Sequence, residues 1–560
     1  MTIDCCFPDN PLFVRLLETA HKDLNHVVIL DPDRGVEVSY GRLLNDILAW
    51  RRVIQKQLPR EILDSQGMIS AKPAYIGLLS SNSYEFIVAI LAILAVGGAV
   101  MPLRAQSFPD GVELLIDQAK PVCLVATDEH MPLAKTMHEE CLSRGNPTEL
   151  VRISINTTSS EAPESTGFAI DQRVVLPSDD PSLLVLTSGS VGRPKAVVHS
   201  MRRLLINNGP QGTPEDTILL HRPPGGTQGL VGVVTALLYG IKTEILGEGQ
   251  TSMRVWKRLR CGGVTMLTGS SVFWIDMMKY YNTNIAALSL EERDKYLQSA
   301  KDLRSAACAG SMPTPVVKGF WKKLLGGRSL KLAYGSTEVG GVLSTNGVTY
   351  LSNEACLGKP LPGVTVKLSN GDHGELLIKT PSMLLGYLNS PKQTMAALDE
   401  EGFYRSGDIA HISKGRYIMD GRAKADFIQY QNVQVCLLEV EFALKDLSYI
   451  AEGYIVPVVD NSGQHRVGAL VRVEGRSSEG YNEELTLKTL RRDLAEGLAL
   501  YKLPTVLRVL QEGEEAPLGC TGKFKRYEAA KVYFPHSEHG DITTLPSKVE
   551  VWPLEVGSNS

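Results

Sequence analysis

The sequence predicts an α/β protein whose large N-terminal domain is followed by a small α+β C-terminal domain. Up to about residue 420, short apolar runs alternate with segments of helical length, which is typical of layered α/β architecture with largely parallel sheets. Residues 354–379 differ, because two strand-like runs flank an Asn-Gly-Asp turn, the chemistry of a β-hairpin. We therefore expect residues 1–420 to form two α/β layered subdomains plus a β-rich subdomain, and residues 421–560 to form a separate small domain.

Short apolar runs predict the strands of the α/β part. They lie at 75–79, 122–126, 183–186, 242–246 and 264–267, and the segments 110–118 and 252–260 have helical length. The run 86–101 is wholly apolar or glycine, yet it is shorter than the roughly 18 residues that a membrane span requires. Asn82 followed by Glu85 resembles a capping box at its start. We expect a buried helix here and no transmembrane segment.

The character of the chain changes after Tyr417. The residues Asp420-Gly421-Arg422 are expected to interrupt the strand-like run 416–419. The remainder contains the apolar runs 435–444, 450–456 and 466–473 and the helix-like run 485–499, which together indicate a small α+β module. The polar tail from about residue 535 is expected to be loosely held.

Composition narrows the function classes. The net charge is −4 and no basic stripe is visible, so a nucleic-acid partner is not expected. Nine scattered cysteines without Cys-x-x-Cys spacing are typical of reduced thiols. The first residues lack the basic start and apolar run of a signal peptide. We expect a cytoplasmic enzyme.

The loop at 187–196 follows a predicted buried strand and is rich in small hydroxyl and glycine residues, with one lysine. Glycines let the backbone approach a ligand closely, and backbone N–H groups, hydroxyls and a lysine can then bind phosphate oxygens. The Gly-Lys-Ser/Thr of a Walker loop is missing. An ordinary Ser/Gly turn is the alternative. The candidate phosphate-binding residues are Thr187, Ser188, Gly189, Ser190, Gly192 and Lys195.

Three further turns carry polar side chains. In the run 332–341, Thr337 stands beside Glu338; a carboxylate in a phosphate site is costly unless a cation separates the two, so Glu338 is a candidate Mg²⁺ ligand. Asp408 follows a Ser-Gly turn and is a candidate for binding ribose hydroxyls, while Lys523 follows Gly522 near the end of the small module. Taken singly, each could be a surface turn, an Asx turn or an exposed lysine.

The order of these motifs resembles the acyl-adenylate-forming (AMP-binding) enzyme superfamily, which includes acyl-CoA ligases, 4-coumarate–CoA ligases, peptide-synthetase adenylation domains and firefly luciferase. The matching motifs are the loop 187–195, Tyr-Gly-x-Thr-Glu at 334–338, Gly-Glu-Leu at 374–376, Gly-Tyr at 386–387, Ser-Gly-Asp at 406–408, Gly-Arg-x-Lys at 421–424 and Gly-Lys at 522–523. The segments 39–41 and 82–103 also look like the family, so the resemblance spans nearly the whole chain.

The resemblance implies ATP-dependent activation of a carboxylic acid to acyl-AMP with release of pyrophosphate, followed by acyl transfer to a thiol, most often coenzyme A. It implies a small domain that rotates about a hinge at Lys424, bringing Lys523 into the site for adenylation. The implied roles of the other residues are binding of pyrophosphate by Lys195, of adenine by Tyr334 and Gly335, and of ribose by Asp408 and Arg422; Ser336 completes the turn and Gln434 matches the family's glutamine.

By analogy, small and apolar residues line the acid pocket: Gly226, Leu230, Phe273, Gly310, Ser311 and Ala333. Such a lining favours an apolar or aromatic acid over a dicarboxylate. Gly226 stands where the family usually has an aromatic residue, and Ala425 looks like an insertion beside the hinge. The family's Ile-Lys-Tyr-Lys-Gly run is replaced by Ile-Gln-Tyr-Gln-Asn at 428–432, which bears on the thioester step.

Three alternatives remain at this stage. A stand-alone adenylating enzyme could transfer the acyl group to the phosphopantetheine of a carrier protein. A non-catalytic nucleotide-binding protein is suggested by the altered residues at 428–432. Oxidation of the luciferase kind is not forbidden by any residue. The acid and the oligomeric state are not predicted.

Overall fold

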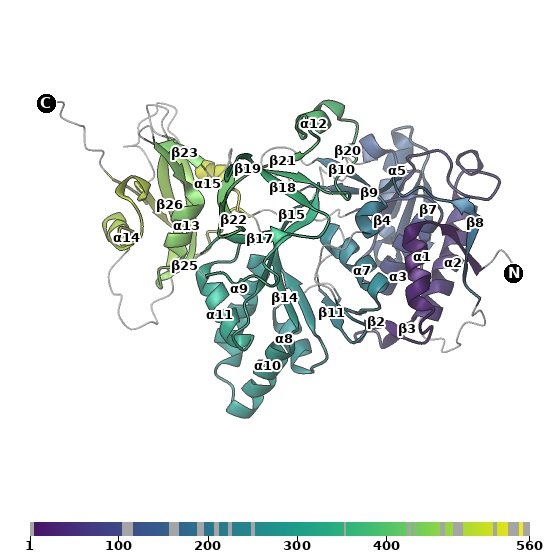
Figure 1. The fold of residues 1–560 in the computed structure, drawn as a ribbon, viewed down its shortest axis with the longest axis horizontal. Coiled ribbons are helices and arrows are strands. Elements are labelled where there is room, and N and C mark those ends of the chain that lie inside the picture. Colours follow the sequence, from purple (N-terminus) through teal and green to yellow (C-terminus); the bar gives the residue numbers. More distant parts are fainter. Residues whose placement is uncertain are drawn as a thin grey trace.

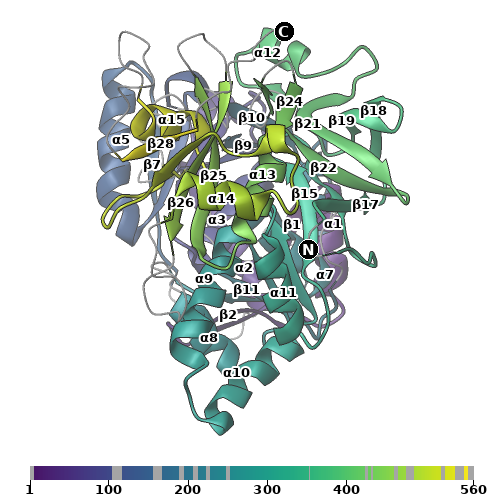
Figure 2. The same cartoon turned by 90° about the vertical axis from the view of Figure 1, so that its left-hand side faces the viewer.

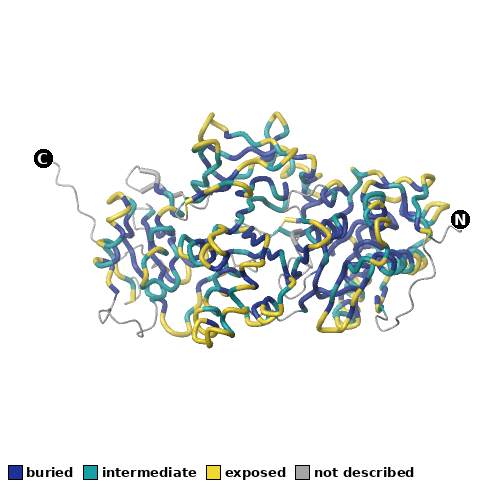
Figure 3. The backbone as a smooth tube through the Cα atoms, turned by 60° about the horizontal axis from the view of Figure 1, so that its bottom comes forward, coloured by how far each residue is buried: buried dark blue, intermediate teal, exposed yellow. Residues whose placement is uncertain are grey.

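The computed structural model contains two large mixed sheets followed by a smaller C-terminal domain (Figure 1). The residues that it describes are 5–103, 116–155, 167–187, 195–205, 212–221, 227–247, 252–351, 354–422, 427–430, 433–459, 465–473, 485–518, 524–535 and 548–552. Figure 3 shows that buried backbone concentrates in the strands and inner helices of each part, while the outer loops are exposed.

The first sheet has seven strands and is mainly parallel. Its order is β20 (Gly386–Tyr387), β10 (Ala196–Ser200), β9 (Pro181–Leu186), β5 (Ala99–Pro102), β4 (Tyr75–Leu79), β6 (Cys123–Thr127) and β7 (Glu149–Ile153). Helices α2 (Tyr40–Gln57), α3 (Tyr84–Ala95) and α5 (Met131–Ser143) belong to this part. The β4 strand matches the predicted bounds because its five side chains are all buried apolar or glycine residues.

The sequence predicts one buried helix over the run 86–101, and this prediction is wrong: the run contains the end of a helix and then a strand. Helix α3 ends at Ala95, and Gly97 turns the chain with φ +87° into the buried strand β5. Close packing also requires Gly98, since a β-carbon there would lie 2.8 Å from the Ile76 side chain. The helix cap is Ser83, whose hydroxyl accepts from the Phe86 N–H, so the capping residue lies one position after Asn82.

The second sheet has thirteen strands and continues into the β-rich subdomain. Its order is β18 (Thr365–Asn370), β19 (His373–Lys379), β21 (Tyr404–Ser413), β22 (Arg416–Arg422), β17 (Cys356–Pro360), β16 (Gly340–Ser344), β15 (Lys331–Ser336), β14 (Ser305–Ala309), β13 (Met266–Gly269), β11 (Thr217–Leu220), β12 (Lys242–Ile245), β2 (Val27–Asp31) and β3 (Val36–Ser39). The neighbouring pairs from β15 to β2 are parallel. The β18–β19 pair confirms the predicted hairpin.

Helices cover the parallel strands of the second sheet (Figures 1 and 2). They are α7 (Thr227–Tyr239), α8 (Ser252–Arg260), α9 (Ser271–Tyr280), α10 (Leu290–Asp302) and α11 (Pro315–Leu324), and α8 has the predicted bounds. The predicted helix 110–118 lies largely outside the described residues. Smaller elements are β1 (Cys6–Asp9), which pairs with β8 (Ala169–Val175), and the helices α1 (Pro11–Ala20), α6 (Arg202–Leu205) and α12 (Pro391–Ala396).

Strand β22 runs through the residues expected to interrupt it. Gly421, with φ 142°, pairs with Ile409 at an irregularity of register, and the pairing resumes between Asp408 and Arg422. A glycine therefore lets the strand continue past Asp420 instead of ending it.

Among its described residues, the C-terminal domain contains a four-stranded sheet and three α-helices. Its elements are the hairpin β23 (Phe427–Tyr430) and β24 (Val433–Cys436), the sheet strands β25 (Ile450–Val459), β26 (His465–Val473), β27 (Val506–Val509) and β28 (Val549–Val551), and the helices α13 (Leu437–Lys445), α14 (Leu487–Leu494) and α15 (Arg526–Tyr533). No helix among the described residues is both long and apolar enough to cross a membrane.

The prediction of a loosely held tail is wrong for residues 548–552. Strand β28 adds to the edge of the C-terminal sheet by antiparallel pairing with β27. Glu550 accepts from the first N–H of helix α14 at 2.7 Å, and the Arg491 guanidinium lies 4.3 Å from the ring centre of Trp552. A polar tail thus contains one short strand that pairs with residues about 40 positions earlier in the chain.

Candidate active site

Two hydrogen bonds close the base of the predicted phosphate loop. The Thr187 N–H donates to the Lys195 carbonyl at 2.8 Å, and the Lys195 N–H donates to the Thr187 hydroxyl at 3.3 Å. These bonds join the end of β9 to the start of the antiparallel strand β10. Ser188, Gly189, Ser190 and Gly192 lie outside the described residues.

Tyr387 connects the phosphate loop to the predicted metal ligand. The ammonium of Lys195 lies 4.5 Å from the centre of the Tyr387 ring, and the Tyr387 hydroxyl donates to Glu338 Oε1 at 3.1 Å. Glu338 is also fixed through its backbone, since its carbonyl accepts from the Leu384 N–H at 2.6 Å. Burial, followed by the charge of Glu338, raises the pKa of both Tyr387 and Tyr404. Sequence reasoning gave Tyr387 no role, although its motif was recognised.

A tight turn between β15 and β16 carries Thr337 and Glu338. Gly335 is required there, because a β-carbon at this position would lie 1.9 Å from the carbonyl oxygen of Gly340. The Ser336 hydroxyl is buried and has no hydrogen-bond partner among the described residues. The turn therefore carries two hydroxyl groups, of Ser336 and Thr337, followed by the carboxylate of Glu338.

Asp408 is 3% exposed and links the turn to the end of the large domain. It accepts from the Tyr334 hydroxyl at 2.5 Å and from Arg422 Nε at 2.7 Å. The second contact follows from register, because Asp408 and Arg422 face each other on β21 and β22. Burial, together with the charge of Asp408, raises the pKa of Tyr334. The structure thus brings together the residues predicted to bind adenine and ribose.

The described residues of the predicted acid pocket lie mostly at the carboxyl ends of the parallel strands of the second sheet. Ser311 fixes the start of α9, with its hydroxyl 2.7 Å from that of Ser271. Phe273 stacks on His221 with ring centres 4.3 Å apart, a contact that sequence reasoning did not identify. Gly310 is exposed and has φ +85°, and Ala333 is half-buried.

Leu230 differs from the other pocket candidates. It is 1% exposed and packs within the main hydrophobic core, so its role in an acid pocket stays a prediction. Gly226 and Lys424 lie outside the described residues, as does Lys523.

The C-terminal domain is described on both sides of Lys523. Leu518 and Phe524 pair across that segment, and the Phe524 ring stacks on Tyr454 at 4.1 Å. Gln434 belongs to strand β24, pairing with Gln429 in the hairpin. The position of the predicted adenylation lysine itself stays a prediction.

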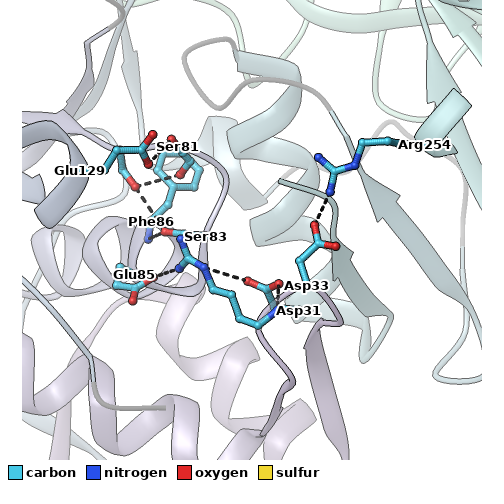
Figure 4. Close-up of polar contacts among 10 residues, drawn as sticks. Asp31, Asp33, Ser81, Ser83, Glu85, Phe86, Glu129 and Arg254 are labelled. Atoms are coloured by element: carbon cyan, nitrogen blue, oxygen red, sulfur yellow. Dashed lines mark hydrogen bonds and ion pairs between the residues drawn. The ribbon is translucent and has the colours of Figure 1, made fainter. Parts of the chain in front are cut away.

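A polar cavity of about 210 Å³ lies apart from these residues, at the carboxyl ends of β4, β6 and β7 (Figure 4). In it the Arg34 guanidinium donates to Glu85 at 3.2 Å, joining the β2–β3 turn to the start of α3, and Ser81 donates to Glu129 at 3.1 Å. The Arg34–Glu85 pair connects the two large sheets, whereas Ser81 and Glu129 both follow strands of the first sheet. No cluster of three metal-binding side chains is found in the part of the chain that the structure describes.

Comparisons with known proteins identify the family of the chain. Residues 62–388 match the AMP-binding enzyme family. The chain is 34% identical over 535 residues to the acyl-CoA ligase oryP of Aspergillus oryzae, covering 94% of this chain and 93% of the relative. It is 28% identical over 534 residues to a malonate–CoA ligase of Arabidopsis thaliana, covering 89% of this chain and 85% of the relative.

Two solved structures share the fold. ATP-bound MatB from Rhodopseudomonas palustris has a TM-score of 0.74 at 19% identity, covering 93% of this chain and 98% of that chain. The anthranilate CoA ligase AuaEII in complex with anthranoyl-AMP has a TM-score of 0.73 at 18% identity, covering 92% and 96%. The predicted α/β fold class is confirmed, and the family match covers more than half of the sequence. The chain belongs to the AMP-binding enzyme family.

Proposed function

We propose that this protein is an AMP-forming acid–CoA ligase: it activates a carboxylic acid with ATP, releases pyrophosphate and transfers the acyl group to coenzyme A. The observation that supports this best is the contact series from Thr187 through Lys195 and Tyr387 to Glu338. It joins the start of a phosphate loop to a carboxylate, in a chain of the AMP-binding family. The relative named an acyl-CoA ligase, which this chain matches along nearly its full length, supports coenzyme A as the acceptor.

The first step needs cations, because a carboxylate must attack an α-phosphate that is itself anionic. In our proposal Lys195 binds the pyrophosphate, and Lys523 neutralises negative charge on the reacting oxygen atoms. Thr337 donates to a phosphate oxygen. The bond between acid oxygen and phosphorus forms as the bond to pyrophosphate breaks, so the protein supplies position and charge, without a covalent enzyme intermediate.

Glu338 fits a magnesium site that is completed by substrate. Mg²⁺ in proteins is commonly held by one or two carboxylates plus phosphate oxygens and water, and Glu338 is held in place by the Tyr387 hydroxyl and by its own backbone. Bound there, the ion would offset phosphate charge. Asp408 is oriented by Tyr334 and Arg422, which supports its proposed role at the ribose.

The acid that we propose is apolar or aromatic. Ala333, Gly310 and the Phe273–His221 stack offer apolar contact, while Ser271 and Ser311 bind each other. A malonate-like diacid is the second candidate, favoured by the relatives named malonate–CoA ligases. Its second carboxylate would need a cation in the pocket.

Acid-dependent exchange of labelled pyrophosphate into ATP tests the first step. The screen contains fatty, aryl and amino acids and malonate, with Glu338→Gln as the inactive variant and Glu401→Gln, an exposed glutamate, as its matched control. The proposal is supported if at least one acid gives exchange with the wild type and this exchange is lost in Glu338→Gln. A complete absence of acid-dependent exchange despite ATP binding would instead favour a non-catalytic nucleotide-binding protein.

Addition of coenzyme A to the exchanging acid tests the second step. Formation of the acyl-CoA thioester supports the ligase. A stable acyl-AMP that is consumed only by a phosphopantetheine-bearing carrier protein would identify a stand-alone adenylating enzyme, and oxygen consumption would point to oxidation of the adenylate.

A further inference from the structure

Two buried basic side chains lie beside the turn that carries Thr337 and Glu338, and the mechanism above uses neither. His199 is the fourth residue of β10 and is 0% exposed; Arg203, in the short helix α6 that follows, is 6% exposed. Arg203 Nε has no hydrogen-bond partner among the described residues, and the backbone of Thr337 interacts with the His199 ring. No carboxylate in the described part of the chain forms an ion pair with Arg203.

Arg203 packs directly on the turn. A β-carbon built on Gly340 would lie 2.6 Å from Arg203 Cζ and 2.7 Å from Nη1, so the guanidinium lies directly against this glycine, whose φ of +78° also disfavours a side chain. Gly340 pairs with Ser336 across the turn. Because consecutive α-carbons are about 3.8 Å apart, the α-carbons of Gly340 and Glu338 are at most about 7.6 Å apart.

The two basic groups differ in charge at physiological pH. Burial, and then the neighbouring Arg203, lowers the pKa of His199 to about 3, so that its ring is neutral at physiological pH. Burial also lowers the pKa of Arg203, to about 10, which still leaves the guanidinium charged. Arg203 therefore brings a positive charge to the turn, next to a neutral ring.

A buried cation without a counter-charge destabilises the folded protein, and an apolar side chain of similar size would fold better. The contact with the turn suggests what offsets this cost. ATP brings several negative charges to Thr337 and Glu338, and charges that are partly buried are screened only weakly by salt.

We propose that Arg203 is a positioning residue of the nucleotide site: its guanidinium holds the 336–340 turn toward the anionic reactants, which supply a counter-charge that none of the described residues provides. This inference rests on the proposed function for the location of the triphosphate. Arg203 acts through Gly340 and the turn, without touching the substrate.

Equilibrium binding of ATP, without acid or coenzyme A, tests the inference on the full-length chain. The variant Arg203→Met removes the charge and keeps the length of the side chain, whereas Arg203→Lys keeps a charge. The neighbouring Arg202 is the matched control, since it lies in the same helix but is exposed and paired with Asp179 on the surface. Thermal unfolding with and without ATP is measured for each variant.

We expect Arg203→Met to weaken ATP binding about tenfold, on the scale of one partly screened charge, while its unfolding midpoint without ATP stays at or above that of the wild type. Arg203→Lys should bind ATP within about threefold of the wild type, and Arg202→Met should be unchanged. If Arg203→Met does not fold, Arg203→Gln takes its place.

Two results overturn the inference. One is ATP binding by Arg203→Met equal to that of the wild type, and the other is a lysine variant that is stable yet binds as weakly as the methionine variant. A wild-type chain that binds no ATP overturns the proposed function as well, so the two failures are distinguishable.

Discussion

Replacing Gly335 with alanine tests whether the turn of the candidate active site must keep its close backbone approach. The new β-carbon would lie 1.9 Å from the Gly340 carbonyl oxygen and 2.7 Å from its carbonyl carbon, whereas real β-carbons essentially never come within 3.0 Å of such atoms. Both clashing atoms belong to the backbone, so no side-chain rotation relieves them. The two strands must separate by about 1.1 Å at the residues that flank Thr337 and Glu338.

Overpacking of this kind lowers the free energy of unfolding by about 1–3 kcal/mol. Displacement of catalytic groups by about 1 Å reduces rates by about 100-fold, so we expect Gly335→Ala to retain on the order of 1% of the wild-type rate of acid-dependent ATP–pyrophosphate exchange. The rate is measured at saturating ATP, and folding is checked by circular dichroism and thermal unfolding.

Gly319→Ala is the matched control. Gly319 lies inside helix α11, and no atom lies within 4 Å of a β-carbon built on it. Alanine is favoured over glycine within a helix by about 0.5–1 kcal/mol, so this variant should be as active as the wild type and slightly more stable. An exchange rate for Gly335→Ala within threefold of the wild type would refute the argument from the close approach.

Three further predictions concern the proposed magnesium site and the C-terminal domain. Tyr387→Phe removes the donor to Glu338 at 3.1 Å; we expect half-maximal exchange to need several-fold more Mg²⁺, and an unchanged magnesium titration would contradict this role. Burial alone would raise the pKa of Glu441, but the Arg526 guanidinium and then Lys445 lower it from the ordinary 4.5 to about 2. Glu441 therefore stabilises the fold above pH 4.5, and this contribution is lost as the pH falls toward 2. Denaturant unfolding should therefore show a stability gap between wild type and Glu441→Gln that closes over this range; a constant gap would argue against it. Ending the chain at residue 547 removes β28 and should lower the stability of the C-terminal domain by about 2 kcal/mol, as measured by thermal unfolding; an unchanged midpoint would mean that the strand contributes nothing.

Local patterns were sufficient for much of the fold. Strand β4 and helix α8 have the predicted bounds, since a uniformly apolar strand and an amphipathic helix are recognisable without their partners. The run 86–101 was misread because apolar content does not distinguish a buried helix from a helix followed by a buried strand; the glycine at position 97 was the available signal. Strand β28 could not be predicted from its polar surroundings, because an edge strand depends on the sheet to which it adds.

The candidate site shows the same division. Motifs indicated Thr187, Lys195, Glu338 and Asp408. The structure joins the first three through Tyr387 and places Asp408 against Tyr334 and Arg422. The Tyr387 contact with Glu338 joins residues 49 positions apart, and no local pattern indicates such a pairing. Arg203 was missed for a different reason: adjacent arginines look alike in sequence, and only burial distinguishes it from Arg202.

The hairpin formed by β2 and β3 has a consequence for synthesis of the chain on the ribosome. Ile29 of β2 pairs with Thr243 of β12, and this parallel pairing adds the N-terminal hairpin to the far edge of the second sheet. At translation rates of about 5–20 residues per second, the partner strand emerges roughly 10–40 s after the hairpin. During that interval the apolar edge of residues 27–31 has no partner strand in the sheet, so the nascent chain is open to mispairing with other chains, and to chaperones that bind exposed strands, until residue 245 has been made.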